Sequence, residues 1–312
     1  MSLDLKDLES YFELQHKNKI FCTRLCVDGK KFCILYDYSK KDEIEKFVSN
    51  FTEYLPYYVY NADSLECIDP KDNIGDRLAE ISKNCWTGPT VPKRDLKVNG
   101  IFGEVFLDFY ERIVKKEKLA STYASRRDFK SKSENKGFDN VLFAINNNEI
   151  EFVFAESKFV ASKSSANAAL VSDITGVPAT KDKPEVIGHL TPDFMNDYIT
   201  FVVEKGAFFS DSDKMLLKPF FKELNEVLMN KGGNFISFLI EKEIKINCVF
   251  FAIFKCASTT PADYIAAYNE IESTAKSHLE NMGFKKYGIE IVFIPTHASS
   301  MEIKGAIDGY YQ

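Results

Sequence analysis

Three residues in the middle of the chain combine types and spacing that suit metal-dependent chemistry. Asp139 begins one apolar run, and Glu156 and Lys158 stand two residues apart in a second run. Carboxylate oxygens are ligands that Mg²⁺ or Mn²⁺ prefers, and a nearby lysine can orient or deprotonate a nucleophile or stabilise charge on a phosphate. A metal held there would polarise a scissile phosphate and lower the pKa of its bound water. The three residues therefore predict phosphodiester hydrolysis.

These residues fall in two apolar runs that are typical of β-strands. The runs are DNVLFAI (139–145) and IEFVFAESKFV (150–160), and four polar residues (146–149) join them. Two extended runs on either side of a short polar turn predict an antiparallel hairpin. The two strands of this hairpin must position the three residues.

The pairing within the hairpin decides which side chains meet. If Ile145 faces Ile150, the numbers of facing residues sum to 295, and Asp139 stands opposite Glu156. Because side chains alternate along a strand, Asp139, Glu156 and Lys158 are then expected on one face. Two facing carboxylates repel, which predicts a positive charge beside them, either the ammonium of Lys158 or a divalent cation.

A plainer interpretation is a strand end at the surface, where Glu156 and Lys158 form an ordinary ion pair. The strand around them, VFAESKFV, is apolar on both faces. A strand that is buried on both faces reads as a continuous apolar run. The pattern therefore favours a buried site over a solvated edge.

The sequence GFD (137–139), followed by FAESK (154–158), resembles the core of the PD-(D/E)XK nuclease superfamily. In that superfamily an Asp at the start of one strand and a Glu-x-Lys on the next build the metal site, and a preceding helix often supplies another Glu. The resemblance implies an α/β fold, with a restriction-endonuclease-like mixed sheet flanked by helices and an N-terminal α/β extension. Phe138 departs from the superfamily name, which has Pro at this loosely kept position.

The resemblance also implies roles for individual residues. Glu104, on a helix expected at 100–118, corresponds to the helical Glu. Glu104, Asp139 and Glu156 would then bind Mg²⁺ or Mn²⁺, and together with Lys158 they would form the catalytic set. Glu104 has a second explanation, because Glu in the first turn of a helix is favoured by the helix macrodipole. Glu104 also forms an acidic stripe with Asp108 and Glu111, and such a stripe is typical of a solvated helix face.

The wider order of elements resembles the nuclease subunit of the Hachiman antiphage system. The order is an N-terminal α/β portion, a helix with Gly-Glu, the GFD and ESK motifs, and a late strand–helix–strand unit. This resemblance implies a bacterial cytoplasmic effector that cuts DNA and works with a large superfamily 2 helicase.

A basic segment precedes Asp139. Residues 112–136 contain nine Lys and Arg against three Asp and Glu, in a chain whose formal net charge is −6. Such a segment beside a metal site suits phosphate contacts, although a solvated, flexible loop would have the same composition. The candidate nucleic-acid-binding residues are Arg126, Arg127, Lys130, Lys132 and, at the start of a later helix, Lys163.

The length of 312 residues suggests about two domains or one large one. The loop at 86–92 is the best boundary, so we expect an N-terminal portion (1–98) and a nuclease core (99–312), with the two sharing one continuous unit as the favoured arrangement. The other expected elements are an opening helix, a hairpin at 20–38, helices at 40–55 and 71–84, an extended run at 54–60, helices from about 164, at 193–205 and at 264–282, and strands at 245–254 and 288–295.

Composition excludes several classes of protein. Hydrophobic residues make up 45% of the chain, which is enough for a folded core, and an acidic net charge argues against holding DNA by bulk charge alone. No membrane span, signal peptide, G-x-S-x-G motif or Walker loop is visible, so we expect a cytoplasmic protein that is neither a serine hydrolase nor a self-contained NTPase. The seven cysteines do not complete a zinc-binding set and read as small core residues.

Two other functions remain open at this point. A non-catalytic nucleic-acid-sensing or scaffold subunit could use the same fold, but the intact motif favours catalysis. A glycosidase could use Asp139 and Glu156 as acid and nucleophile. That reading leaves Lys158 and the basic segment unexplained, and the one Trp offers little for stacking on sugars.

Overall fold

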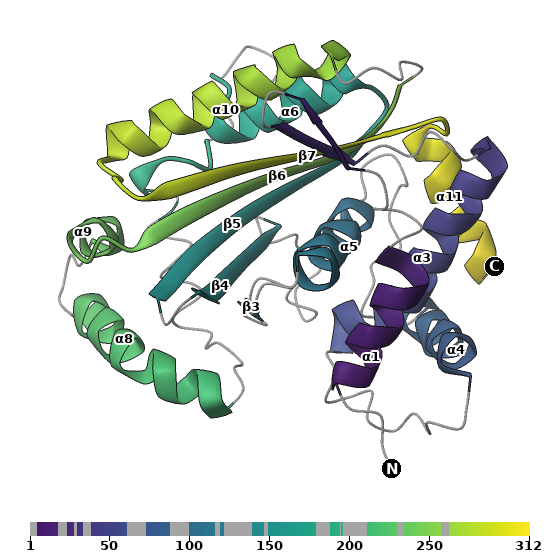
Figure 1. The fold of residues 1–312 in the computed structure, drawn as a ribbon, viewed down its shortest axis with the longest axis horizontal. Coiled ribbons are helices and arrows are strands. Elements are labelled where there is room, and N and C mark those ends of the chain that lie inside the picture. The colour runs from purple at the N-terminus through teal and green to yellow at the C-terminus, as the bar shows by residue number, and fades with distance from the viewer. Residues whose placement is uncertain are drawn as a thin grey trace.

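The computed structural model shows a mixed α/β fold in which helices cover both faces of a sheet (Figure 1). It describes residues 5–17, 24–27, 30–33, 39–60, 73–87, 100–115, 119–121, 139–146, 149–178, 188–193, 195, 211–229, 234–256 and 262–312.

The central sheet has five strands in sequence order. The second strand runs antiparallel to the first and the third, and the last three strands run parallel to one another. The predicted parallel unit near the C-terminus is confirmed, with a long helix between its two strands. The strands are β3 (Leu119–Ser121), β4 (Asn140–Asn146), β5 (Glu149–Val160), β6 (Lys245–Lys255) and β7 (Tyr287–Thr296), and the helix is α10 (Ala262–Met282).

The predicted hairpin and its pairing are confirmed. Ile145 pairs with Ile150 and Val141 with Phe154, so the paired numbers sum to 295 as expected. The turn is shorter than predicted, because the ladder continues to one further pair of polar residues at 146 and 149. Backbone hydrogen bonds make this pair whatever the polarity of its side chains.

The two faces of β5 bury different cores, as the strand period of two requires. Phe152 and Phe154 pack with α6 (Lys163–Thr175) and α10 on one face, whereas Val153 and Ala155 pack with α5 (Ile101–Phe109) on the other. Figure 1 shows α6 and α10 along one side of the sheet, and α5, α3 and α11 on the other. β5 is therefore covered on both faces by helices.

The N-terminal helices share their core with the C-terminal helix. Phe51 and Leu78 belong to the same buried cluster as Phe102 and Ile303, and the Trp86 ring stacks on Tyr311 at a centroid distance of 4.9 Å. The boundary predicted at 98/99 stays a prediction, because 88–99 lie outside the described residues. The helices are α1 (Leu5–Phe12) with the π-helical turn η1 (Glu13–Lys17), α3 (Lys40–Tyr60), α4 (Ile74–Thr87) and α11 (Ser300–Tyr311).

A small separate hairpin confirms another prediction. β1 (Arg24–Val27) and β2 (Lys30–Cys33) are antiparallel, with Val27 opposite Lys30 on either side of the predicted turn at 28–29. This hairpin makes a sheet of its own and does not join the central one.

The extended run predicted at 54–60 is wrong. Helix α3 continues through these residues and contains Pro56, although Pro removes one backbone hydrogen bond from a helix interior. Tyr54, Leu55 and Tyr58 are at most 4% exposed, because this end of the helix is surrounded by other elements. Tertiary packing here outweighs the local preference against a helix.

The helix predicted at 100–118 is also shorter, since α5 ends at Phe109 and a π-helical turn, η3 (Tyr110–Val114), follows. Asp108 and Glu111 are fully buried, so the interpretation of an acidic solvated face is wrong for them. Arg112 contacts Asp108 at 3.1 Å and Lys115 contacts Glu111 at 3.4 Å. Basic residues one turn later thus allow both carboxylates to be buried.

Two helices were not predicted, α8 (Asp211–Met229) and α9 (Phe235–Glu241). The helix predicted at 193–205 lies almost entirely outside the described residues. Within the described part of the chain, no helix is both long and apolar enough to cross a membrane.

Candidate active site

Asp139 is held where the ladder between β4 and β5 ends. The last pair is Asn140 with Ala155, whereas β5 continues to Val160. Beyond that pair, a side chain replaces the backbone of β4 as hydrogen-bond acceptor. Asp139 Oδ2 accepts hydrogen bonds from the Ser157 backbone N–H at 2.7 Å and from the Ser157 hydroxyl at 2.5 Å. Asp139 is therefore fixed to β5 beside the Glu-Ser-Lys sequence.

Glu156 and Lys158 lie on the same face of β5, as predicted. Lys158 Nζ is 2.7 Å from Glu156 Oε1, and Glu156 is only 3% exposed. The other carboxylate oxygen of Glu156, Oε2, is buried and has no hydrogen-bond partner among the described residues. This pair is thus a buried one, which excludes the surface strand end considered above.

The predicted common face is wrong for Asp139, because its carboxylate bonds to Ser157, whose hydroxyl lies against Gly103 on α5, whereas Lys158 contacts Asp173 on α6. Asp139 lies in a bend just before Asn140, outside the β4–β5 ladder, so the alternation of side chains along a strand does not extend to it. It still lies close enough to Glu156 for the charge of Glu156 to raise the pKa of Asp139. The Asp139 carboxylate thus contacts β5 from the end of β4, and the Glu156 carboxylate belongs to β5 itself.

The two carboxylates affect each other's protonation. Burial, followed by the charges of Glu156 and Glu104, raises the pKa of Asp139 well above its ordinary value. Burial also works to raise the pKa of Glu156, but Lys158 and His189 outweigh it and lower that pKa to about 2. Without a cation, the two carboxyl groups therefore differ in acidity, and Glu156 is the more acidic of the two.

Glu104 approaches from α5, as predicted. The preceding residue, Gly103, lies against β5, where a β-carbon would be 2.7 Å from the Ser157 hydroxyl oxygen. The Tyr58 hydroxyl donates a hydrogen bond to Glu104 Oε2 at 3.0 Å. Glu104 lies close enough to Asp139 for its charge to raise the pKa of Asp139.

The donor set fits a hard divalent cation. Mg²⁺ is typically bound by one or two carboxylates together with waters and phosphate oxygens. Asp139 and Glu156 supply two carboxylates, and one buried oxygen of Glu156 accepts no hydrogen bond from the residues that the structure describes. In the described residues no three His, Cys, Asp or Glu side chains form a group able to hold a metal. A ligand role for Glu104 thus stays a prediction.

Sequence reasoning missed two polar residues at the site. Asp173 on α6 lies 2.5 Å from Lys158 Nζ, and His189 Nδ1 lies 3.5 Å from Glu156 Oε2. The helical period held a signal for Asp173, because it shares a face with the buried Leu170, three residues earlier.

The predicted nucleic-acid-binding residues are mostly untested by the structure. Arg126, Arg127, Lys130 and Lys132 lie outside the described residues. Lys163 occupies the first turn of α6, with its Nζ 5.9 Å from the centre of the Tyr264 ring, a cation–π geometry.

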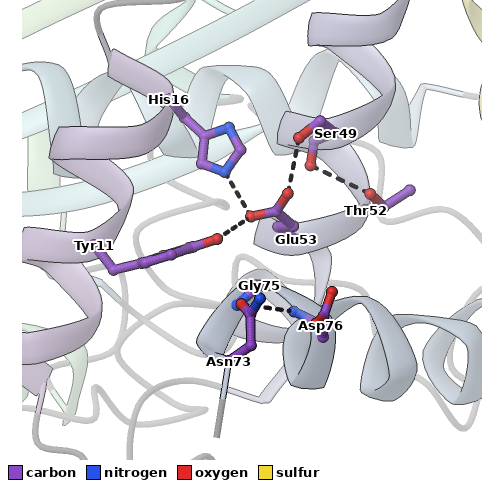
Figure 2. Close-up of polar contacts among 8 residues, drawn as sticks. All are labelled: Tyr11, His16, Ser49, Thr52, Glu53, Asn73, Gly75 and Asp76. Carbon is purple, nitrogen blue, oxygen red and sulfur yellow. Dashed lines mark hydrogen bonds and ion pairs between the residues drawn. The ribbon is translucent and has the colours of Figure 1, made fainter.

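A second polar cluster lies between α1, α3 and α4 (Figure 2). The Tyr11 and Ser49 hydroxyls donate to Glu53 at 2.5 and 2.8 Å, and His16 Nε2 lies 2.8 Å from the same carboxylate. A cavity of about 570 Å³, lined in part by Tyr11 and Glu53, opens beside it. These bonds join α1 with η1 to α3, and none of the predicted site residues belongs to this cluster.

Comparison with known proteins assigns the chain to a family. The model of the HamA family matches residues 9–300, which include α3, α4 and both strands of the candidate site. Neither a curated protein nor a solved structure matches the chain. The match confirms the predicted resemblance to a Hachiman protein, whereas membership of the PD-(D/E)XK superfamily stays a prediction. Because the family match covers nearly the whole length, the chain belongs to the HamA family of Hachiman antiphage defence proteins.

Proposed function

We propose that this HamA protein is a Mg²⁺- or Mn²⁺-dependent deoxyribonuclease with a PD-(D/E)XK core. The observation that carries the proposal is the pair of carboxylates on one end of β5. Asp139 is hydrogen-bonded to Ser157 of that strand. Glu156 is buried beside Lys158, and one of its oxygens has no hydrogen bond within the described part of the chain. A mixed sheet with helices on both faces is compatible with the restriction-endonuclease-like fold implied by the motif.

In this proposal Asp139 and Glu156 hold the cation, and Glu104 adds negative charge from α5. When bound, the metal would polarise the scissile phosphate and activate a water molecule. Each carboxylate is restrained by the protein, Asp139 by two hydrogen bonds and Glu156 by Lys158, so little reorganisation would be needed on metal binding.

Lys158 is best suited to stabilise negative charge. Burial works to lower the pKa of its ammonium, but Glu156 and Asp173 outweigh burial and raise that pKa above its ordinary value. The side chain is therefore protonated at neutral pH. A fixed ammonium can bind a phosphate oxygen whose charge grows in the transition state, which favours this role over that of a general base.

The proposed substrate is DNA, delivered by a superfamily 2 helicase that also restrains cleavage. A chain of net charge −6 attracts DNA weakly, so a partner that presents the strand would supply affinity that this protein lacks. The basic segment before Asp139 would then contact phosphates close to the metal.

The central experiment compares plasmid cleavage by the wild type and Glu156→Ala, with and without the helicase, in Mg²⁺, Mn²⁺ or EDTA. We expect cleavage by the wild type to need the metal and to be lost in Glu156→Ala. Glu149→Ala is the matched control, because Glu149 is an exposed residue of the same strand. Equal cleavage by wild type and Glu156→Ala would overturn the proposal, and a helicase complex without any metal-dependent cleavage would favour a non-catalytic sensing subunit.

The DNA contact has its own test. Replacing Arg126, Arg127, Lys130 and Lys132 by Glu should slow cleavage strongly and leave binding to the helicase intact. Pull-down and cleavage assays on the same variant separate the two effects. Wild-type cleavage rates after charge reversal would show that the segment is a solvated loop.

A further inference from the structure

Lys158 is held by a residue that lies outside the nuclease motif. Its Nζ is 2.5 Å from an Asp173 carboxylate oxygen and 2.7 Å from Glu156 Oε1. The ammonium therefore lies between two carboxylates, one from β5 and one from α6. The Lys158 and Asp173 side chains are 22% and 18% exposed, so the pair is mostly shielded from solvent.

The end of α6 that carries Asp173 is itself fixed in place. Leu170 and Ile174 are buried on either side of Asp173, and the backbone carbonyl of Asp173 accepts a hydrogen bond from the His189 N–H at 2.5 Å. Gly188 makes this contact possible, because a β-carbon there would lie 2.5 Å from the Ile174 carbonyl oxygen. The backbone that carries the Asp173 carboxylate is therefore held in a fixed position beside Lys158.

The ion pair is not needed to attach α6 to the sheet. Apolar packing of Leu170 and Ile174 holds the helix against the core, and Ser162 caps its first turn. Partly exposed ion pairs contribute little to stability. Asp173 supplies a second ionic contact for the long, flexible side chain of Lys158. With Glu156 alone, the ammonium group would be less restrained.

We propose that Asp173 is a positioning residue that holds the Lys158 ammonium beside the metal-binding carboxylates for catalysis. This inference rests on the proposed nuclease function. Asp173 acts through Lys158 and touches no reacting atom itself. Its loss should slow the chemical step and leave the binding of DNA and the fold unchanged.

The test uses the helicase complex and measures kcat and KM for DNA in Mg²⁺, together with the melting temperature of each variant. Asp173→Asn keeps the size of the side chain and removes its charge, and should lower kcat by about 10- to 100-fold with little change in KM or melting temperature. Asp173→Glu restores the charge and should recover part of that loss. Glu270→Gln is the matched control. Glu270 lies on α10 and accepts a hydrogen bond from Asn167 on α6, away from Lys158, so this variant should cleave like the wild type.

The outcomes separate this inference from the proposed function. Cleavage by the wild type, its loss in Glu156→Ala and unchanged kcat in Asp173→Asn would overturn the positioning role alone. A loss that follows the melting temperature, or no recovery in Asp173→Glu, would also overturn it by indicating a structural role. A wild-type complex without metal-dependent cleavage would overturn both.

Discussion

Gly103 on α5 lies so close to Ser157 on β5 that a β-carbon at position 103 would be 2.7 Å from the serine hydroxyl oxygen. The same hydroxyl donates the 2.5 Å hydrogen bond to Asp139. Because Gly103 has no side chain, Ser157 has room to donate its hydrogen bond to the Asp139 carboxylate. This contact links the packing of α5 directly to the geometry of Asp139.

The first prediction is that Gly103→Ala damages both the fold and the site. The added methyl group would push on Ser157 and cost about 1–3 kcal/mol of unfolding free energy, as overpacked cores typically do, and cleavage should fall as Asp139 shifts. Gly305→Ala is the control, since a β-carbon there meets nothing within 4 Å in the interior of α11. This control should be neutral or stabilising by up to about 1 kcal/mol. Urea unfolding measures both, and equal effects would contradict the close contact.

The second prediction concerns the charge on Asp139. Its pKa is raised in the folded protein, so the wild type loses stability as the pH rises from the unfolded value of 3.8 through the folded value. Asp139→Asn removes this penalty and keeps an oxygen for Ser157. Without metal it should unfold at a higher temperature than the wild type at pH 7, and the advantage should vanish as the pH approaches 3.8. Its cleavage activity should be lost.

Thermal melts over a range of pH check this prediction, with and without Mg²⁺. Added Mg²⁺ should stabilise the wild type more than Asp139→Asn, because the variant lacks one proposed ligand. Severe destabilisation of the variant at pH 7 would show that the carboxylate is a structural group.

The third prediction concerns Lys304, a buried lysine on α11. Its Nζ is 3.4 Å from the Phe159 carbonyl oxygen and 5.5 Å from the centre of the Phe102 ring, and burial lowers its pKa. Removing a charge from water costs several kcal/mol, whereas each cation–π contact returns about 0.5–2 kcal/mol. Lys304→Met should therefore stabilise the protein by about 1 kcal/mol at neutral pH.

The pH dependence distinguishes this cause from simple apolar packing. Wild-type Lys304 is penalised below its lowered folded pKa, and the penalty disappears as the pH rises through that value toward 10.5. The advantage of Lys304→Met should shrink over the same interval. Lys276→Met, at an exposed position on α10, should show no such trend. Loss of stability in Lys304→Met would mean that the cation–π contacts dominate.

The fourth prediction concerns Glu53, which joins α3 to the N-terminal helix in Figure 2. Burial works to raise the pKa of Glu53, but the hydrogen bonds from His16, Tyr11 and Ser49 outweigh it and lower that pKa. Its stabilising contribution is thus present above the unfolded value of 4.5 and lost as the pH falls through the folded value. Glu53→Gln should cost about 1–2 kcal/mol at pH 7 and progressively less below pH 4.5.

Chemical denaturation at several pH values measures this effect. Glu45→Gln serves as the control, because Glu45 is an exposed residue of the same helix that makes only a long surface contact to Lys41 in the described part of the chain. A constant difference between wild type and Glu53→Gln from pH 7 to pH 3 would contradict the assigned cause.

Local sequence pattern was enough to predict the hairpin that carries the site. Its strands are adjacent in the chain, so apolar runs and a short turn determine the pairing of Val141 with Phe154. The face of Glu156 and Lys158 follows from the same pairing. The pattern could not show that Asp139 bonds to Ser157, because this contact arises where the ladder ends and strand alternation no longer applies.

Contacts between distant segments account for the other differences. The helical period indicates the buried face that Asp173 shares with Leu170 but not its contact with Lys158, and nothing near Tyr54 reveals the Asp108 carboxylate to which its hydroxyl donates at 2.8 Å. The first pair forms because α6 folds back onto β5, and the second because α3 packs against α5. The helix through Pro56 has the same origin, since its stability comes from the surrounding core rather than from the residues of the helix.

The order of the strands also determines when the site can exist during synthesis. Glu156 pairs across the sheet with Phe250, which the ribosome adds 94 residues later. At 5–20 residues per second, about 5–20 seconds pass before the second neighbour of β5 is made. The hairpin can form early, but its outer edge stays unpaired until then, and α11 arrives later still. The proposed nuclease centre therefore lies on a strand that is paired on both sides only after most of the chain has been synthesised.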